Sequence, residues 1–171
     1  LSGRESEKVW DDPIIGNTQF DYISVKKVVI TREETTLYMH IDYPASGTFT
    51  FGNKTFISAW NKQYLIRGCD KFELGDYVHT DPDTWSMDFI LTFEPLPLST
   101  KVFDVIEGFF DNAYNLFNVR QRGVKLPVAK VPSEYRARYP EKDIWPEMKY
   151  SEEPITIHFE TLNFKSGMRP R

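Results

Sequence analysis

Apolar and polar residues alternate along several stretches of the chain up to Arg120, which is the pattern of β-strands with one buried face. The clearest stretches are Thr35–Tyr43 and Met87–Phe93. Ile23–Thr31 is also rich in β-branched residues, but its alternation slips at Lys26–Lys27, which predicts a bulge or a turn at that point. The alternation predicts a core that includes Leu37, Met39, Ile41, Phe89, Leu91, Phe93 and Phe103.

Shorter strand candidates lie between these stretches, separated by turn sequences such as YPASG, FGNK and HTDPDT. Gly47–Phe51 and Thr55–Ala59, joined by GNK, are predicted to form a hairpin. Pro97–Phe110 also permits a helix, but its β-branched and aromatic residues favour a strand, with Val102–Gly108 as the candidate. Many short strands at this spacing predict an all-β protein, with an immunoglobulin-like antiparallel β-sandwich over Val9–Arg120.

The rest of the chain has a different character. Residues 1–8 are polar and predicted to be disordered. Residues 121–154 contain five prolines and mixed charges, which predicts a linker or a surface arm. Alternation returns in Ile155–Phe164, so residues 155–171 are predicted to be either a terminal strand of the same sheet or the start of a further β domain.

Composition narrows the classes of function. With 171 residues and 15% aromatic residues, the chain can bury a sizeable core. Its net charge of −4, without a basic cluster, argues against nucleic acid as a partner. The single cysteine, Cys69, leaves no internal disulfide and no CxxC motif, and a structural role is expected for it. No apolar run approaches the roughly 20 residues that a membrane-spanning helix needs.

Two acids in the segment Lys101–Asn112, Asp104 and Glu107, are the first candidates for chemistry. A glycosidase needs two carboxylates flanking one bond, but residues three apart in a strand face opposite sides. We therefore expect one solvated acid and one acid bonded to a turn amide. On this basis we predict that the chain is not an enzyme.

Other polar residues give weaker candidates. His79, Asp81 and Asp83 alternate as metal ligands can, but Asp-Pro-Asp is also ordinary turn chemistry, which we favour. His40 and His158 are predicted to be exposed on the polar faces of strands. Neither a metal nor a cofactor is therefore predicted.

Aromatic residues in loops or at strand ends are the remaining surplus: Trp60, Tyr64, Tyr77 and Trp85. Such rings can stack against a sugar or a peptide, so these four residues are the candidate ligand-binding site. Packing at the core and rim of a β domain would use the same residues.

The run FILTFEPLPLSTKVFDVIEG, Phe89–Gly108, resembles a segment of the N-terminal β-sandwich of secreted TlpA-like thioredoxin proteins of Gram-negative bacteria. The signature there is F-x-P-L-P-x-x-T-K-x-F-D-x-I-E-G, and this sequence matches it at Phe93, Pro95, Leu96, Pro97, Thr100, Lys101, Phe103, Asp104, Ile106, Glu107 and Gly108. The resemblance extends over roughly Val9–Arg120.

The resemblance implies a non-catalytic accessory domain of an exported protein, located in the periplasm or cell envelope. It is also compatible with a lipid anchor on the full-length protein. Its partner would be another protein or a redox domain in the same chain. The sequence departs from the family in two ways: FFDNAY lacks the cysteine pair that relatives often carry, and the CxxC of a redoxin domain is missing. The alternative is a glycan- or peptide-binding module that uses the aromatic residues.

Overall fold

The computed structural model describes residues 6–42, 48–80, 83, 85–110 and 112–124. Of the predicted arm, residues 121–124 are described; the rest of it and the predicted terminal strand lie outside the described residues. The described part contains no helix, and hence none that could cross a membrane. Its strands are β1 (Glu7–Asp11), β2 (Ile14–Thr18), β3 (Ile23–Thr31), β4 (Thr35–Asp42), β5 (Thr48–Phe49), β6 (Phe56–Ala59), β7 (Lys62–Cys69), β8 (Val78–His79), β9 (Ser86–Phe93), β10 (Val102–Ile106) and β11 (Leu116–Arg120).

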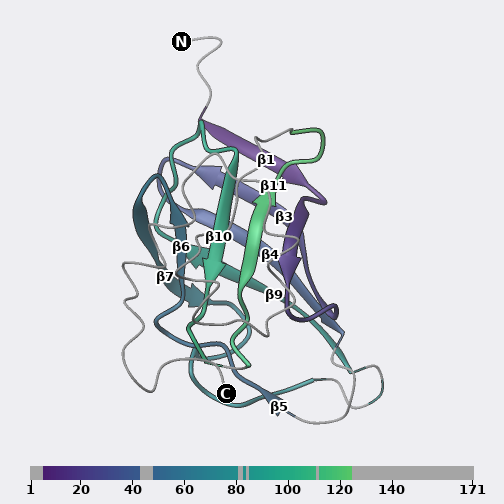
Figure 1. Ribbon diagram of the computed structural model, residues 1–171. Helices are drawn as coiled ribbons and strands as arrows, with labels where there is room; N and C mark the ends of the chain where they lie inside the picture. Colours follow the sequence, from purple (N-terminus) through teal and green to yellow (C-terminus); the bar gives the residue numbers. More distant parts are fainter. Residues whose placement is uncertain (1–5, 43–47, 81–82, 84, 111, 125–171) are drawn as a thin grey trace, which may run out of the picture.

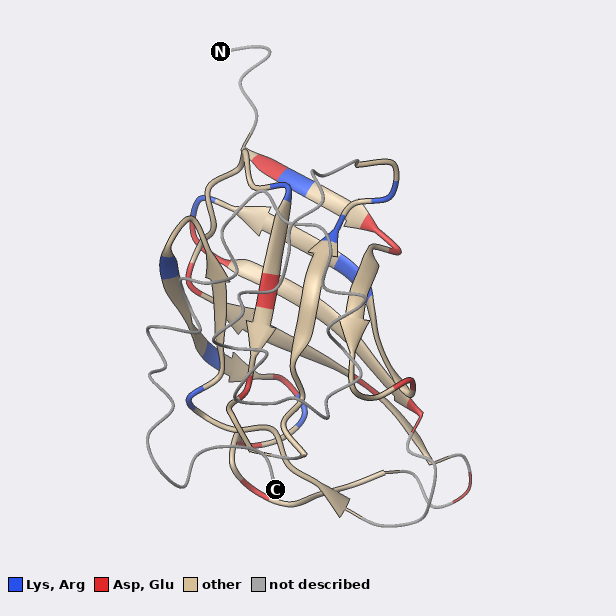
Figure 2. Ribbon diagram, viewed as in Figure 1, with Lys and Arg blue, Asp and Glu red and all other residues tan. Residues whose placement is uncertain are grey.

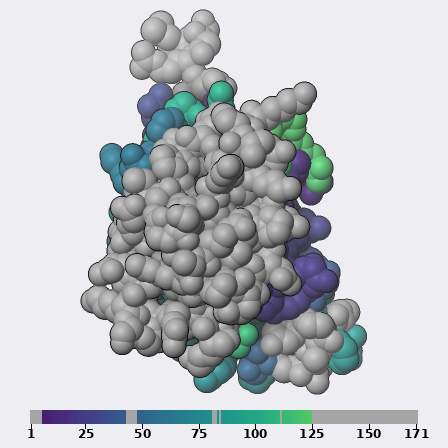
Figure 3. Space-filling view, in the orientation of Figure 1, coloured from purple at the N-terminus to yellow at the C-terminus, as the bar shows by residue number. Residues whose placement is uncertain are grey.

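Nine strands form one antiparallel sheet in the order β1-β3-β4-β9-β7-β6-β10-β11-β2, which curls into two layers at β7 (Figure 1). The first half of β7 pairs with β6 and the second half pairs with β9. We call β1, β3, β4 and β9 the back layer, and β6, β10, β11 and β2 the front layer. Figure 3 shows residues of β6 and β7 on one side of the molecule and residues of β2 on the other. The predicted antiparallel all-β sandwich is confirmed, while the immunoglobulin-like arrangement stays a prediction.

The alternation of apolar and polar residues in β4 and β9 correctly predicts which of their side chains are buried. All seven predicted core residues, in β4, β9 and β10, are at most 2% exposed. The slip in β3 is a bulge, because its pairing with β4 shifts register between Val25 and Lys27. β1 begins at Glu7, so it includes the last two residues of the polar stretch 1–8.

The predicted hairpin of Gly47–Phe51 and Thr55–Ala59 is wrong. β5 pairs with β8 in a separate small sheet, and β6 forms its hairpin with β7. The physical reason lies in Trp60 and Asn61, whose φ values of 55° and 59° give the left-handed turn that a two-residue hairpin loop requires. Asn is a common residue in such turns, whereas Trp is not, so the sequence WN did not indicate a turn.

Val102–Ile106 is a strand, β10, as predicted, and all five of its side chains are buried. Phe103 and Val105 join the core between the layers, so Asp104 points to the outer side of the front layer. Figure 2 shows this acid as the one charged segment of β10. The expectation of a solvated acid is wrong for Asp104, which is 6% exposed. Val102 and Ile106, which share its face of β10, are buried too.

Candidate functional site

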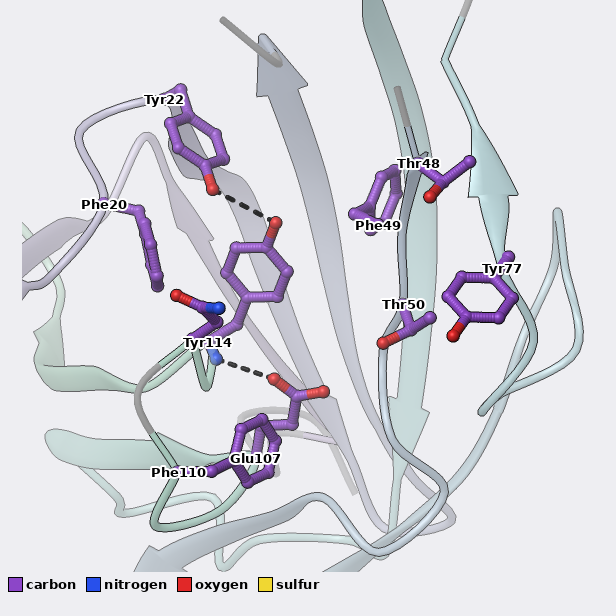
Figure 4. Close-up of a pocket in the computed structure, with 10 residues that line it drawn as sticks. Phe20, Tyr22, Thr48, Phe49, Thr50, Tyr77, Glu107, Phe110 and Tyr114 are labelled. Carbon is purple, nitrogen blue, oxygen red and sulfur yellow. Dashed lines mark hydrogen bonds between the residues drawn. The ribbon is translucent and has the colours of Figure 1, made fainter. Parts of the chain in front are cut away.

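A cavity of about 300 Å³ opens at the end of the sandwich that carries β5, where several strand connections meet (Figure 4). We call it the end pocket. The β2–β3 and β10–β11 connections form one wall, and β5 with the residue before β8 forms the other. The lining residues are Phe20, Tyr22, Thr48, Phe49, Thr50, Tyr77, Glu107, Phe110, Asn112 and Tyr114.

Glu107 anchors the segment that connects β10 to β11. Its Oε1 accepts a hydrogen bond from the backbone N–H of Tyr114 at 2.7 Å, and its Oε2 accepts one from Gly52 at 2.8 Å. Asn115 completes the turn, because its Oδ1 accepts the N–H groups of Glu107 and Gly108 while its Nδ2 donates to the Gly108 carbonyl. The sequence predicted that one acid of the pair Asp104 and Glu107 bonds to a turn amide, and this is confirmed for Glu107.

Tyr114 holds the aromatic wall in place. Its ring stacks on Phe51 with the centroids 5.5 Å apart, and Phe20 meets it edge-on at 5.0 Å. The hydroxyls of Tyr22 and Tyr114 lie 3.2 Å apart, within hydrogen-bonding distance. Edge-on and stacked contacts of this kind fix ring orientation, so this wall is preformed.

Among the described residues that line the end pocket, one carries a carboxyl group, Glu107. Burial raises the pKa of Glu107 above its ordinary value, and the hydrogen bonds from Tyr114 and Gly52 partly oppose that rise. Asp104, the other acid of the segment, lies on the outer side of β10 and accepts the backbone N–H of Asn118 at 2.7 Å. The two acids therefore do not converge in one cleft.

The structure does not gather the four predicted ligand-binding aromatics. Tyr77 lines the end pocket and is 78% exposed. Trp60 forms the β6–β7 turn, where its indole N–H donates to the Thr100 hydroxyl, and Trp85 precedes β9 at the opposite end of the paired strands. Tyr64 packs against the core.

The sequence interpretation missed most of the end pocket, because its residues come from loops and the short strand β5 between positions 20 and 114, where no periodicity reports which segments meet. One signal was present. The segments FDY and GFFDNAY each place aromatic residues beside a turn, at Phe20, Tyr22, Phe110 and Tyr114. Rings that cluster next to turn residues are candidates for the end of a sandwich.

A second, more open hollow of about 570 Å³ lies on the back layer around His40. The His40 ring lies between Asp88, at 2.5 Å from Nδ1, and Asp42, at 2.9 Å from Nε2. The hydrogen bond with Asp88 is the largest cause that raises the pKa of His40, and partial burial opposes it. His40 was predicted to be exposed, but its side chain is mostly covered, at 23% exposure.

The remaining candidates from the sequence are Cys69 and the possible metal ligands. Cys69 is partly buried, and desolvation raises the pKa of its thiol, which disfavours the nucleophilic thiolate. No cluster of three metal-ligating side chains occurs in the part of the chain that the structure describes. His158 and Asp81 lie outside that part.

Comparison with known proteins identifies no relative: no family model, no curated protein and no solved structure matches the chain.

Proposed function

We propose that the chain is a non-catalytic binding module whose end pocket accepts a small ligand or one group of a larger partner. The observation that carries this proposal is the preformed cavity of about 300 Å³, lined by aromatic rings and a few polar groups. Small-molecule sites are typically lined by apolar and aromatic residues with a few polar groups. Their volumes start at about 300 Å³, which is the volume of this cavity.

The chemistry of the lining supports binding rather than catalysis. Glu107 is the one carboxylate among the described lining residues, and each of its oxygens already accepts a backbone hydrogen bond. Hydrolysis of a glycosidic bond uses two carboxylates on opposite sides of that bond. Asp104 does not line the cavity, so it does not supply the second one.

We also propose that the module is an accessory domain of an exported thioredoxin-like protein, located in the periplasm or cell envelope. The resemblance of Phe89–Gly108 supports this proposal. The signature acids have roles in the fold, since Asp104 and Glu107 each accept a backbone N–H from the segment that leads into or through β11. A stop codon directly after Arg171, with no redoxin gene nearby, would count against this setting.

The binding proposal is tested by NMR screening of the full ¹⁵N-labelled chain against a library of sugars, amines and aromatic acids. We expect ligands to shift the amide resonances of Gly52 and Tyr114, which donate to Glu107. Tyr77→Ala should weaken binding, because Tyr77 is an exposed lining residue.

The matched control is Trp85→Asn, which removes another exposed ring outside the end pocket. Asn tolerates the positive φ of 55° at this position. Ligands that respond to Trp85→Asn and not to Tyr77→Ala would place the site elsewhere and contradict the proposal. A library without any hit at the pocket amides would contradict it too.

A further inference from the structure

Among the described residues that line the end pocket, Glu107 is the one carboxylic acid, and none is a lysine, arginine or histidine. The causes that shift the pKa of Glu107 are burial and two backbone hydrogen bonds, with no contribution from a neighbouring charged side chain. An anionic ligand would meet an uncompensated carboxylate, so the lining disfavours anions.

Aromatic rings surround this acid on both sides of the cavity. Phe20, Tyr22 and Tyr114 form one wall, Tyr77 stands on the other, and Phe110 lies beside Glu107 (Figure 4). The face of an aromatic ring carries partial negative charge and attracts cations within about 6 Å of its centre. Rings and carboxylate therefore favour the same kind of ligand.

Burial strengthens this preference. Glu107 is 8% exposed, so water solvates its carboxylate poorly. A charge that water solvates poorly interacts more strongly with an opposite charge placed next to it. Each oxygen of Glu107 accepts one hydrogen bond from a backbone N–H group, of Gly52 or of Tyr114. Each oxygen therefore keeps a further lone pair for a ligand.

We propose that the end pocket binds an organic cation, a small alkylammonium or quaternary ammonium group, held by the aromatic walls and by Glu107. This inference rests on the proposed function of the pocket as a binding site. A neutral sugar can use the same rings and the hydroxyls of Thr48 and Thr50, but it gains nothing from the net negative charge of the lining.

The test compares choline with 3,3-dimethylbutan-1-ol, its neutral isostere, by NMR titration of the full chain. Both ligands have the same shape, so a difference in affinity reports the charge. We expect choline to bind at least about tenfold more tightly, with shifts at the amides of Gly52 and Tyr114. In Glu107→Gln this preference should fall to less than about threefold.

Tyr77→Ala provides a second variant in case Glu107→Gln does not fold, since Tyr77 is a largely exposed residue. Tyr77→Ala should weaken the binding of choline more than the binding of the isostere. Trp85→Asn should weaken the binding of neither ligand. Equal affinity of the two ligands, or shifts at the pocket amides with sugars alone, would overturn the cation proposal while the binding module stands. If no compound of any class shifts these amides, both proposals fail.

Discussion

Replacing Asp104 by asparagine tests the burial of an acid in β10. Burial raises the pKa of Asp104 from an ordinary 3.8 to about 7, and the hydrogen bond from the Asn118 N–H opposes that rise. Between these two pH values the unfolded chain releases a proton that the folded protein keeps. The free energy of unfolding therefore falls as the pH rises from about 4 to about 7, and the loss is complete above that window.

The size of the effect follows from the same two values. The difference between about 7 and 3.8 corresponds to roughly 4 kcal/mol, taken as an upper estimate because a buried site relaxes when it ionises. In Asp104→Asn the side-chain oxygen still accepts the N–H of Asn118, while the ionisable group is gone. At pH 8 we expect the variant to exceed the wild type in stability by up to about 4 kcal/mol, and at pH 4 to match it within about 1 kcal/mol.

The difference in stability is measured by urea unfolding at pH 4, 6 and 8. Tryptophan fluorescence monitors the unfolding, since Trp10 is buried in the folded protein. A residual decrease of stability with pH should remain in the variant, because burial also raises the pKa of Glu107. Asp76→Asn, at an exposed position, is the control for removing a negative charge. A variant no more stable than the wild type at pH 8 would show that ionising Asp104 costs the folded protein no stability, and would refute the reasoning.

Two further predictions concern the sheet edges and faces. Gly16→Ala should destabilise the fold by about 1–3 kcal/mol, because the added Cβ would lie 2.7 Å from the Cβ of Asn118. The control is Gly68→Ala, whose added Cβ would have no atom within 4 Å and should change stability by less than about 1 kcal/mol. Equal urea midpoints for the two variants would contradict this prediction. Protonated His40 stabilises the fold fully below pH 6.5, and that contribution is lost as the pH rises through its raised folded pKa. Asp88→Asn should lower this pKa in an NMR titration, and an unchanged value would contradict the assigned cause.

The strands could be predicted where one face is buried and the other is not. β4 and β9 satisfy this condition, since each pairs within the back layer and packs its apolar side chains inward. β10 does not, because it lies between β6 and β11 and both of its faces are buried. Alternation puts Asp104 on the face of the strand opposite Phe103, a predicted core residue, but it carries no information about whether that face meets water.

The connections could be predicted less well, because turns depend on backbone conformation rather than on hydrophobic period. Trp60 adopts a positive φ that its side chain does not favour, and the hairpin it forms decides that β6 pairs with β7. Residues Gly52 and Tyr114 meet at one carboxylate although they are far apart in sequence. Contacts of this kind are set by the packing of the two layers, which no local pattern reports.

Glu107 combines a role in the fold with a role in the proposed site, and this decides which variants are informative. In Glu107→Gln one carboxylate oxygen becomes an NH₂ group, so either Tyr114 or Gly52 loses its acceptor and faces another donor. An unsatisfied buried donor costs about 1–3 kcal/mol, so this variant alone cannot separate lost binding from lost structure. Tyr77 has no such role, since it is exposed, and a loss of cation affinity in Tyr77→Ala with unchanged stability assigns the effect to the end pocket itself.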